Sequence, residues 1–114
     1  MSELQLTARF TIHDGKLDEF KELASQCMKV VREKDSGTLQ YDWFLNDART
    51  ECVVRERYRD SDAVLEHAAD LGDLMGRFMG ISTPEIEIYG APTNGLLEAI
   101  AALQPRVYSA YQSI

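Results

Sequence analysis

The sequence has 114 residues, 45% of them hydrophobic and 27% charged, which is typical of one soluble globular domain with a modest core. The 19 acidic and 12 basic residues give a net charge of −7, which disfavours binding to nucleic acid or to an anionic membrane surface. The segment MSELQLTARF does not resemble a signal peptide, and no apolar run reaches the roughly 18 residues of a membrane span, so a cytoplasmic protein is expected.

The first strand and helix are predicted from periodicity. Residues 4–12 alternate between apolar and polar side chains, which predicts a strand with one apolar face. Asp14 and Gly15 interrupt this alternation. An amphipathic helix follows, with an apolar stripe over residues 17–31 and with Gly37 as its expected C-cap.

Two more strands are predicted at residues 38–45 and 51–58, joined by a hairpin loop at residues 46–50. Strict alternation turns one face of each strand toward the helices, and Glu56 lies in this otherwise apolar series. A carboxylate among buried apolar side chains is unusual, so Glu56 is a candidate functional residue.

The second helix is expected to begin at Asp60 or Ser61 and to carry His67 within its apolar stripe. This position turns a titratable imidazole toward the core. Gly72 and Gly76 weaken the helix and suggest that it splits into two segments. An inward imidazole is either a structural link or part of a functional site.

A fourth strand is predicted at residues 85–89, after Pro84. The order β-α-β-β-α-β predicts an α+β fold, a ferredoxin-like sandwich with both helices on one face of an antiparallel sheet. Residues 1–114 form one domain, with its core at residues 4–90. The C-terminal extension contains a predicted helix at residues 94–103, followed by a tail that ends the chain.

The sheet face away from the helices carries mainly polar side chains, which fits either a solvated surface or packing against a second sheet. The extension adds an apolar helix and two tyrosines, Tyr108 and Tyr111, that need a surface to cover, either a partner subunit or the mouth of a pocket. We therefore expect a homodimer, with these two tyrosines as contacts between subunits.

Four segments together resemble the antibiotic biosynthesis monooxygenase-like (ABM) family of dimeric α+β barrel proteins. They cover roughly residues 4–90 in the right order, and Glu56 and His67 match positions typical of the family. The segments are HDGKLDEF, DSGTLQYDWFLND, RERYRDSDAVLEH and EIEIYG.

The resemblance implies a homodimer in which two sheets close one barrel, with a pocket in each subunit between sheet and helices. Members of the family include cofactor-independent oxygenases of polyketide aromatics, quinol oxygenases, haem-degrading enzymes and an isomerase of a phosphorylated sugar. Many other members have no established activity, so the resemblance predicts architecture better than reaction.

A buried carboxylate and a buried imidazole have strong reason to meet, because each alone is costly in a dry site. We expect Glu56 to orient His67, which then acts as a general base toward a small-molecule substrate. The anion of a quinol, phenolic or polyketide-like substrate reacts directly with O₂, which makes a cofactor-independent monooxygenase the leading prediction. The expected pocket lining is Tyr41, Trp43, Tyr58, Met75 and Phe78.

Other interpretations stay open. His67 is alternatively a structural link between helix and sheet, Glu56 an ion-pair partner of an arginine, and the aromatic residues plain core. The same pocket also suits an isomerase or another proton-transfer enzyme without O₂. A non-catalytic dimeric small-molecule-binding or stress-associated protein is the third alternative.

No cofactor or metal is expected. Cys27 and Cys52 lie in predicted regular elements without a CxxC motif, which indicates reduced, buried thiols. The haem-degrading branch of the family uses an asparagine on the first strand, whereas this first strand has none and Trp43 lies on the second. These departures make haem an unexpected ligand.

Overall fold

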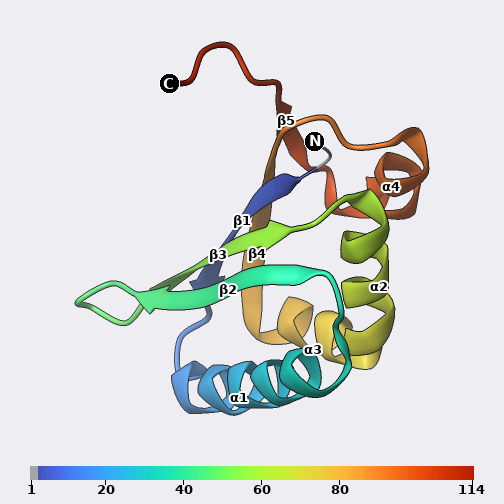
Figure 1. The fold of residues 1–114 in the computed structure, drawn as a ribbon. Helices are drawn as coiled ribbons and strands as arrows, with labels where there is room; N and C mark the ends of the chain where they lie inside the picture. The colour runs from blue at the N-terminus through green and yellow to red at the C-terminus, as the bar shows by residue number, and fades with distance from the viewer. Residues whose placement is uncertain (1–2) are drawn as a thin grey trace.

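The computed structural model describes residues 3–114 and contains a five-stranded sheet with helices packed against one face (Figure 1). The strand order is β2-β3-β1-β4-β5, and its first three pairs are antiparallel whereas β4 and β5 are parallel. The predicted ferredoxin-like α+β sandwich is confirmed. The elements are β1 (Leu4–Ile12), α1 (Leu17–Lys34), β2 (Thr38–Leu45), β3 (Glu51–Tyr58), α2 (Ser61–Leu71), α3 (Asp73–Ile81), β4 (Ser82–Tyr89), α4 (Asn94–Ala99), the 3₁₀ turn η1 (Ala101–Leu103) and β5 (Arg106–Tyr108).

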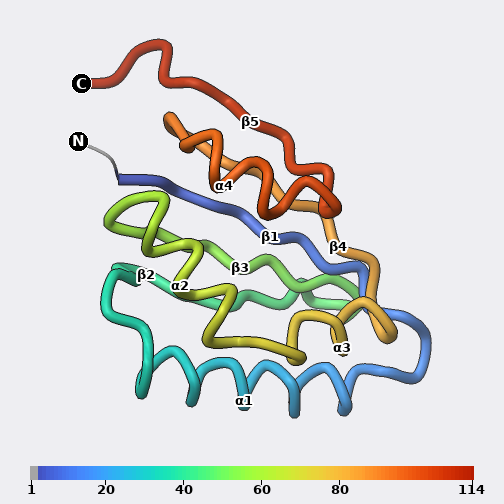
Figure 2. The backbone as a smooth tube through the Cα atoms, turned by 90° about the vertical axis from the view of Figure 1, so that its right-hand side faces the viewer, coloured from blue at the N-terminus to red at the C-terminus, as the bar shows by residue number. Residues whose placement is uncertain are grey.

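The central strand β1 sets which residues share the helix-covered face of the sheet. Leu6 on β1 pairs with Glu56 on β3 and with Ile88 on β4, and Glu56 pairs in turn with Tyr41 on β2. Because side chains alternate along a strand, Glu56 lies among apolar neighbours beneath the helices, as alternation predicts. Helices α1, α2 and α3 contact one another and cover this face (Figure 2).

Aromatic packing holds the helices against the sheet. Phe10 from β1, Phe20 from α1 and Phe78 from α3 are each at most 5% exposed, and their ring centroids lie 5.1 to 5.5 Å apart. Edge-to-face and tilted rings at such separations add to the stabilisation from apolar burial. Cys27 and Cys52 are buried beside this cluster as free thiols, as expected.

The end of α1 differs from its predicted position. The helix ends at Lys34, and its C-cap is Asp35, in an extended conformation that turns the chain toward β2. The expected cap, Gly37, has a different role, because a Cβ atom there would approach the Cβ of Ala63 on α2 to 2.5 Å. The glycine therefore permits close contact between the α1–β2 connection and α2.

The second helical segment begins and breaks as predicted. The carboxylate of Asp60 accepts a hydrogen bond from the backbone N–H of Ala63 at 2.9 Å, which caps α2. Gly72 adopts a φ of 52° and separates α2 from α3, a conformation that favours glycine. Gly76 lies inside α3 and does not interrupt it.

The first part of the C-terminal extension, from α4 to β5, packs on its own subunit, whereas residues 109–114 are exposed. The predicted helix at 94–103 is shorter than expected, since α4 ends at Ala99 and η1 follows, and β5 was not predicted. The predicted fourth strand also begins earlier, at Ser82, because Pro84 pairs with Phe10 within the ladder. Leu96 of α4 is fully buried against Leu4, Tyr58 and Ile88, which anchors the extension.

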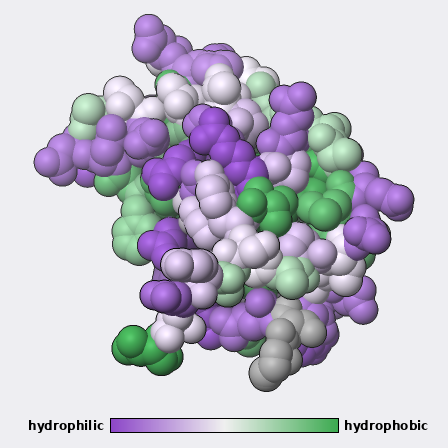
Figure 3. Space-filling view, turned by 90° about the horizontal axis from the view of Figure 1, so that it is seen from above, coloured by the Kyte–Doolittle hydropathy of each residue, from purple (hydrophilic) through white to green (hydrophobic). Residues whose placement is uncertain are grey.

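The end of the molecule near β5 exposes apolar side chains from the extension. Val107, Tyr108 and Tyr111 are 43%, 46% and 91% exposed. Viewed from above, this end shows separate hydrophobic groups between hydrophilic ones (Figure 3). Within residues 3–114, none of the helices combines the length and apolar character needed to cross a membrane.

Candidate active site

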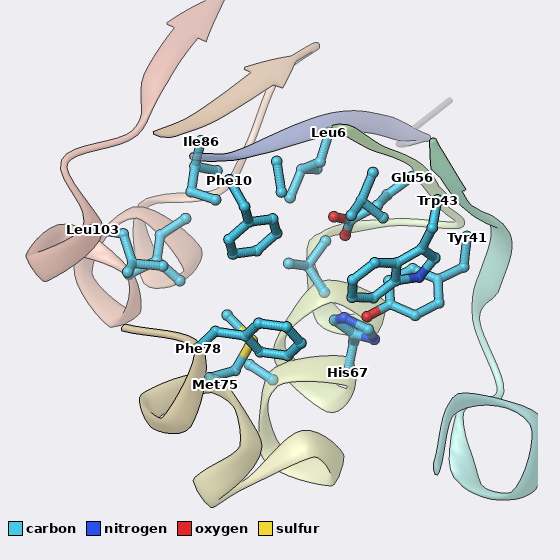
Figure 4. A pocket seen from close by; sticks show the side chains of 15 residues that line it. Leu6, Phe10, Tyr41, Trp43, Glu56, His67, Met75, Phe78, Ile86 and Leu103 are labelled. Carbon is cyan, nitrogen blue, oxygen red and sulfur yellow. The ribbon is translucent and has the colours of Figure 1, made fainter. Parts of the chain in front are cut away.

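A cavity lies between the helix-covered face of the sheet and α2, α3 and the extension (Figure 4). The centre of a water-sized sphere can move through about 80 Å³ of this cavity. One bound water needs roughly 10–15 Å³ on this measure, so the cavity holds several water molecules or a small organic group. Most of its lining is apolar, and the predicted site residues that line it are Tyr41, Trp43, Glu56, His67, Met75 and Phe78.

His67 reaches the cavity from α2, and its side chain is 9% exposed. Its Nδ1 lies 2.8 Å from Oδ2 of Asp35, whose side chain is 1% exposed. A carboxylate only accepts hydrogen bonds, so ionised Asp35 fixes the proton of a neutral imidazole on Nδ1. Among residues 3–114, no protein group is hydrogen-bonded to Nε2, which therefore offers a lone pair.

Asp35 is held in place by the chain around it. Thr38 donates a hydrogen bond from Oγ1 to Oδ2 of Asp35 at 2.6 Å, the same oxygen that His67 contacts. The early end of α1 turns Asp35 toward α2, and α1 and α2 pack together. Sequence reasoning missed Asp35 because it lies in a connection without periodicity, 32 residues from its partner.

Glu56 has a different partner from the predicted one. The Tyr58 hydroxyl donates a hydrogen bond to Oε1 of Glu56, and Asp35 rather than Glu56 is the hydrogen-bond partner of Nδ1. The prediction that Glu56 orients His67 through a hydrogen bond was therefore wrong. Glu56 nevertheless lies close enough to His67 for their charges to interact.

Burial controls the protonation of Glu56. Loss of hydration raises the pKa of this carboxyl above its ordinary value of 4.5, and the positive charge that His67 carries when its ring is protonated, together with the Tyr58 hydrogen bond, offsets only part of that rise. A carboxyl group that keeps its proton can donate a hydrogen bond. Figure 4 shows the Glu56 oxygens directed toward the middle of the cavity.

The two tyrosines beside His67 have different positions. Tyr41 lines the cavity, and its ring centroid lies 5.0 Å from that of His67. Burial, followed by the charge of Glu56, raises the pKa of Tyr41, so its hydroxyl stays protonated. Tyr58 was predicted to line the pocket, but it is fully buried beside Leu96 and is not part of the lining.

The rest of the wall is aromatic and aliphatic. Trp43 lies 5.8 Å from Phe78 between ring centroids, and its Nε1 is buried without a hydrogen-bond partner in the described part of the chain. Ile100 and Leu103 of the extension complete the lining. The apolar helix predicted at residues 94–103 was expected to cover either a partner subunit or the mouth of a pocket, and these two side chains lie at the cavity.

The site therefore combines an imidazole nitrogen without a protein partner, a carboxyl group whose pKa is raised by burial, and a mostly apolar wall. This combination suits removal of a proton from an apolar substrate and delivery of a proton to another position on it. Among the described residues, no group of three or more histidine, cysteine, aspartate or glutamate side chains is placed to hold a metal ion.

Comparison with known structures shows the same fold in several bacterial proteins. MupZ from Pseudomonas fluorescens has a TM-score of 0.87 and 20% identity, covering 100% of this chain and 94% of its own. SnoaB, a cofactor-independent oxygenase from Streptomyces nogalater, has a TM-score of 0.69 and 20% identity, covering 82% of this chain and 97% of its own. The match to MupZ therefore includes the C-terminal extension.

A third solved structure has the same fold, and the sequence itself matches a family model. Rv0793 from Mycobacterium tuberculosis has a TM-score of 0.70 and 22% identity, covering 82% of this chain and 97% of its own. A search of curated proteins gives no match. The family model for antibiotic biosynthesis monooxygenase matches residues 5–70, which is more than half of the 114 residues and includes both Glu56 and His67. The chain belongs to the antibiotic biosynthesis monooxygenase family.

Proposed function

We propose that this protein is a cofactor-independent monooxygenase of a small quinol, aromatic or polyketide-like molecule. The observation that carries the proposal is the state of His67: Asp35 occupies Nδ1, while Nε2 has no protein partner and the ring lines an apolar cavity. Family membership supports an oxygenase, and the similarity in fold to SnoaB, a cofactor-independent oxygenase, agrees with it.

The first step is removal of a proton from the substrate. Nε2 of His67 takes the proton from a phenolic O–H or from a methylene group next to an aromatic ketone. Asp35 stabilises the imidazolium that forms, because its buried carboxylate already accepts the Nδ1–H hydrogen bond. The substrate anion remains against a mostly apolar wall, and a substrate that fills the cavity displaces the water that would reprotonate the anion.

The second step is reaction of the anion with O₂. For a methylene substrate, the carbanion adds O₂ and takes up a proton to give a hydroperoxide. Loss of water from the hydroperoxide then leaves a ketone. The balance is R₂CH₂ + O₂ → R₂C=O + H₂O, so the substrate supplies the electrons and no further reductant is needed. Glu56 lines the same cavity and burial raises its pKa, so in its protonated form this carboxyl would donate a hydrogen bond to the developing peroxide.

A proton-transfer isomerase is the second candidate. It is favoured by the presence of two groups in one cavity: Nε2 of His67, which has no protein partner, and the carboxyl of Glu56, whose pKa burial raises. Such a pair can remove a proton from one atom and return one to another. This reaction needs the same residues but no O₂.

A non-catalytic binding protein is less well supported. A histidine with a purely structural role is expected to have both ring nitrogens bonded to protein groups. The unpartnered Nε2 of His67 argues against that role.

We further propose that the protein is a homodimer and cytoplasmic. Proteins of this family are typically dimeric and bind small molecules. The strongly exposed Tyr111 and the half-exposed Tyr108 offer apolar surface for a partner subunit. The buried free thiols Cys27 and Cys52 are compatible with a reducing compartment.

The test is turnover of a panel of hydroquinones and anthrones, followed by O₂ uptake and by mass spectrometry of products formed under ¹⁸O₂. An oxygenase consumes one O₂ for each ketone formed from an anthrone and places one ¹⁸O atom in it. Product formation at an equal rate without O₂ would replace the oxygenase with the isomerase. Absence of turnover across the panel, together with binding of the same compounds, would favour the non-catalytic protein.

A further inference from the structure

A second carboxyl group lies behind His67, on the side away from the cavity. Asp70 is on α2, one turn after His67, and it is partly buried. Oδ1 of Asp35 and Oδ2 of Asp70 are both fully covered, and neither has a hydrogen-bond partner among the described groups when both residues are ionised. The two side chains are within hydrogen-bonding reach of each other.

Two buried carboxylate oxygens that face each other are stable only with a proton between them. Both groups cannot be ionised at close range without strong repulsion, so such a pair keeps one proton beyond the pH at which an isolated aspartate loses it. Oδ2 of Asp35 already accepts hydrogen bonds from Thr38 and His67. Because two donors already contact Asp35 whereas the covered Oδ2 of Asp70 has none among the described groups, the shared proton is assigned to Asp70.

We propose that Asp70 is a positioning residue that donates its carboxyl proton to Oδ1 of Asp35. Asp35 then accepts three hydrogen bonds, from Thr38, His67 and Asp70, and is held rigidly against Nδ1 of His67. The significance of this arrangement for catalysis rests on the proposed role of His67 as a base. The proton sharing itself does not depend on that role.

The charges around Asp70 support this assignment. The hydrogen bond with Asp35 is the largest cause that raises the pKa of Asp70 above its ordinary value of 3.8, followed by burial and by the charges of Asp35 and Glu66. Lys34, at the end of α1, acts in the opposite direction. Glu66 accepts hydrogen bonds from Ser36, from the backbone N–H and Oγ to Oε1 and from Oγ to Oε2, each at 3.0 Å.

The arrangement makes the support of His67 depend on pH. Below the pH at which Asp70 titrates, the three hydrogen bonds hold Asp35 in place. Above it, two anions face each other and Asp35 loses a donor, so the hydrogen bond to Nδ1 becomes more mobile. An asparagine at position 70 supplies an N–H donor at every pH, whereas an alanine supplies none.

The experiment uses NMR on the full chain, with ¹³C detection of the Asp70 carboxyl and ¹H detection of the Nδ1–H of His67. We expect the Asp70 midpoint to lie above 3.8, and the Nδ1–H resonance of the wild type to broaden as the pH rises through that midpoint. Asp70→Asn keeps the resonance sharp over the whole range, and Asp70→Ala broadens it at every pH. Asp62→Asn, an exposed aspartate on the same helix, serves as the matched control and behaves as the wild type.

Two results would overturn the proposal: an Asp70 midpoint at or below 3.8, or an Asp70→Asn variant whose resonance broadens as in Asp70→Ala. Thermal unfolding of each variant identifies any general loss of structure. The resonance is read without substrate, so failure of the proposed oxygenase activity leaves this test intact. If activity is found, Asp70→Ala lowers kcat more than it raises KM, and Asp70→Asn restores kcat.

Discussion

The two ends of the cavity are built in different ways. At one end, His67, Tyr41 and Glu56 come from α2, β2 and β3; His67 and Glu56 are buried, and Tyr41 is half-buried beside His67. At the other end, Leu103 and Ile100 come from the extension, are only partly buried and make apolar contacts alone (Figure 4). The first of these, the polar end, determines the chemistry of the site. The second, the apolar end formed by the extension, limits the size of the substrate that fits.

The strongest test of the polar end is His67→Ala. Loss of a general base lowers the rate by roughly 10²–10⁴-fold, and turnover of an accepted anthrone or quinol should fall by that amount. His13→Ala is the matched control, because His13 is exposed and far along the chain, with Thr83 as its partner. Equal kcat/KM for His67→Ala and the wild type would mean that the cavity acts without this base.

Removal of Asp35 should have the next largest effect. Asp35→Ala leaves Nδ1 of His67 without its acceptor and frees the ring to rotate, so we expect kcat to fall by about 10²-fold. Unfolding in urea should show a loss of about 1–3 kcal/mol, because Thr38 and His67 both lose a buried partner. Asp47→Ala, in the exposed hairpin, is the control. An Asp35→Ala enzyme with full activity would show that the orientation of His67 does not depend on this contact.

The raised pKa of Glu56 predicts that the free energy of unfolding depends on pH. Its pKa is higher in the folded than in the unfolded chain, so the stability that this group contributes is lost as the pH rises from 4.5 through the folded value. Glu56→Gln cannot titrate, and its free energy of unfolding should lack this decline, which is at most about 1.4 kcal/mol per pH unit. Urea unfolding at several pH values measures it, with the exposed Glu98→Gln as control. Parallel curves for Glu56→Gln and the wild type would show that Glu56 ionises normally.

The smallest expected effect concerns the apolar end. Leu103→Ala enlarges the cavity where the extension closes it, and we expect a shift of about tenfold in relative kcat/KM toward larger aromatic substrates. The loss of stability should stay below the roughly 2–5 kcal/mol of a fully buried leucine, since Leu103 is partly exposed. Leu39→Ala, half-exposed outside the cavity, is the control. Unchanged substrate preference would mean that the extension does not limit size.

The same contrast explains what could be predicted from the sequence. Strand alternation and helical spacing predicted that Glu56 and His67 face the same layer, because both periodicities depend on local geometry alone. Alternation gives the face of a side chain but not what covers it, so Tyr58 was assigned to the pocket although Leu96 of the extension packs over it. Asp35 was missed because no local pattern links a residue after one helix to a histidine on the next.

The central claim is that Nε2 of His67 removes a proton from the substrate, and it can be measured without O₂. Under anaerobic conditions in D₂O, the wild type should exchange the acidic methylene hydrogens of an anthrone for deuterium faster than buffer does. His67→Ala should exchange them at the buffer rate, whereas His13→Ala should match the wild type. Exchange by His67→Ala at the wild-type rate would contradict the account.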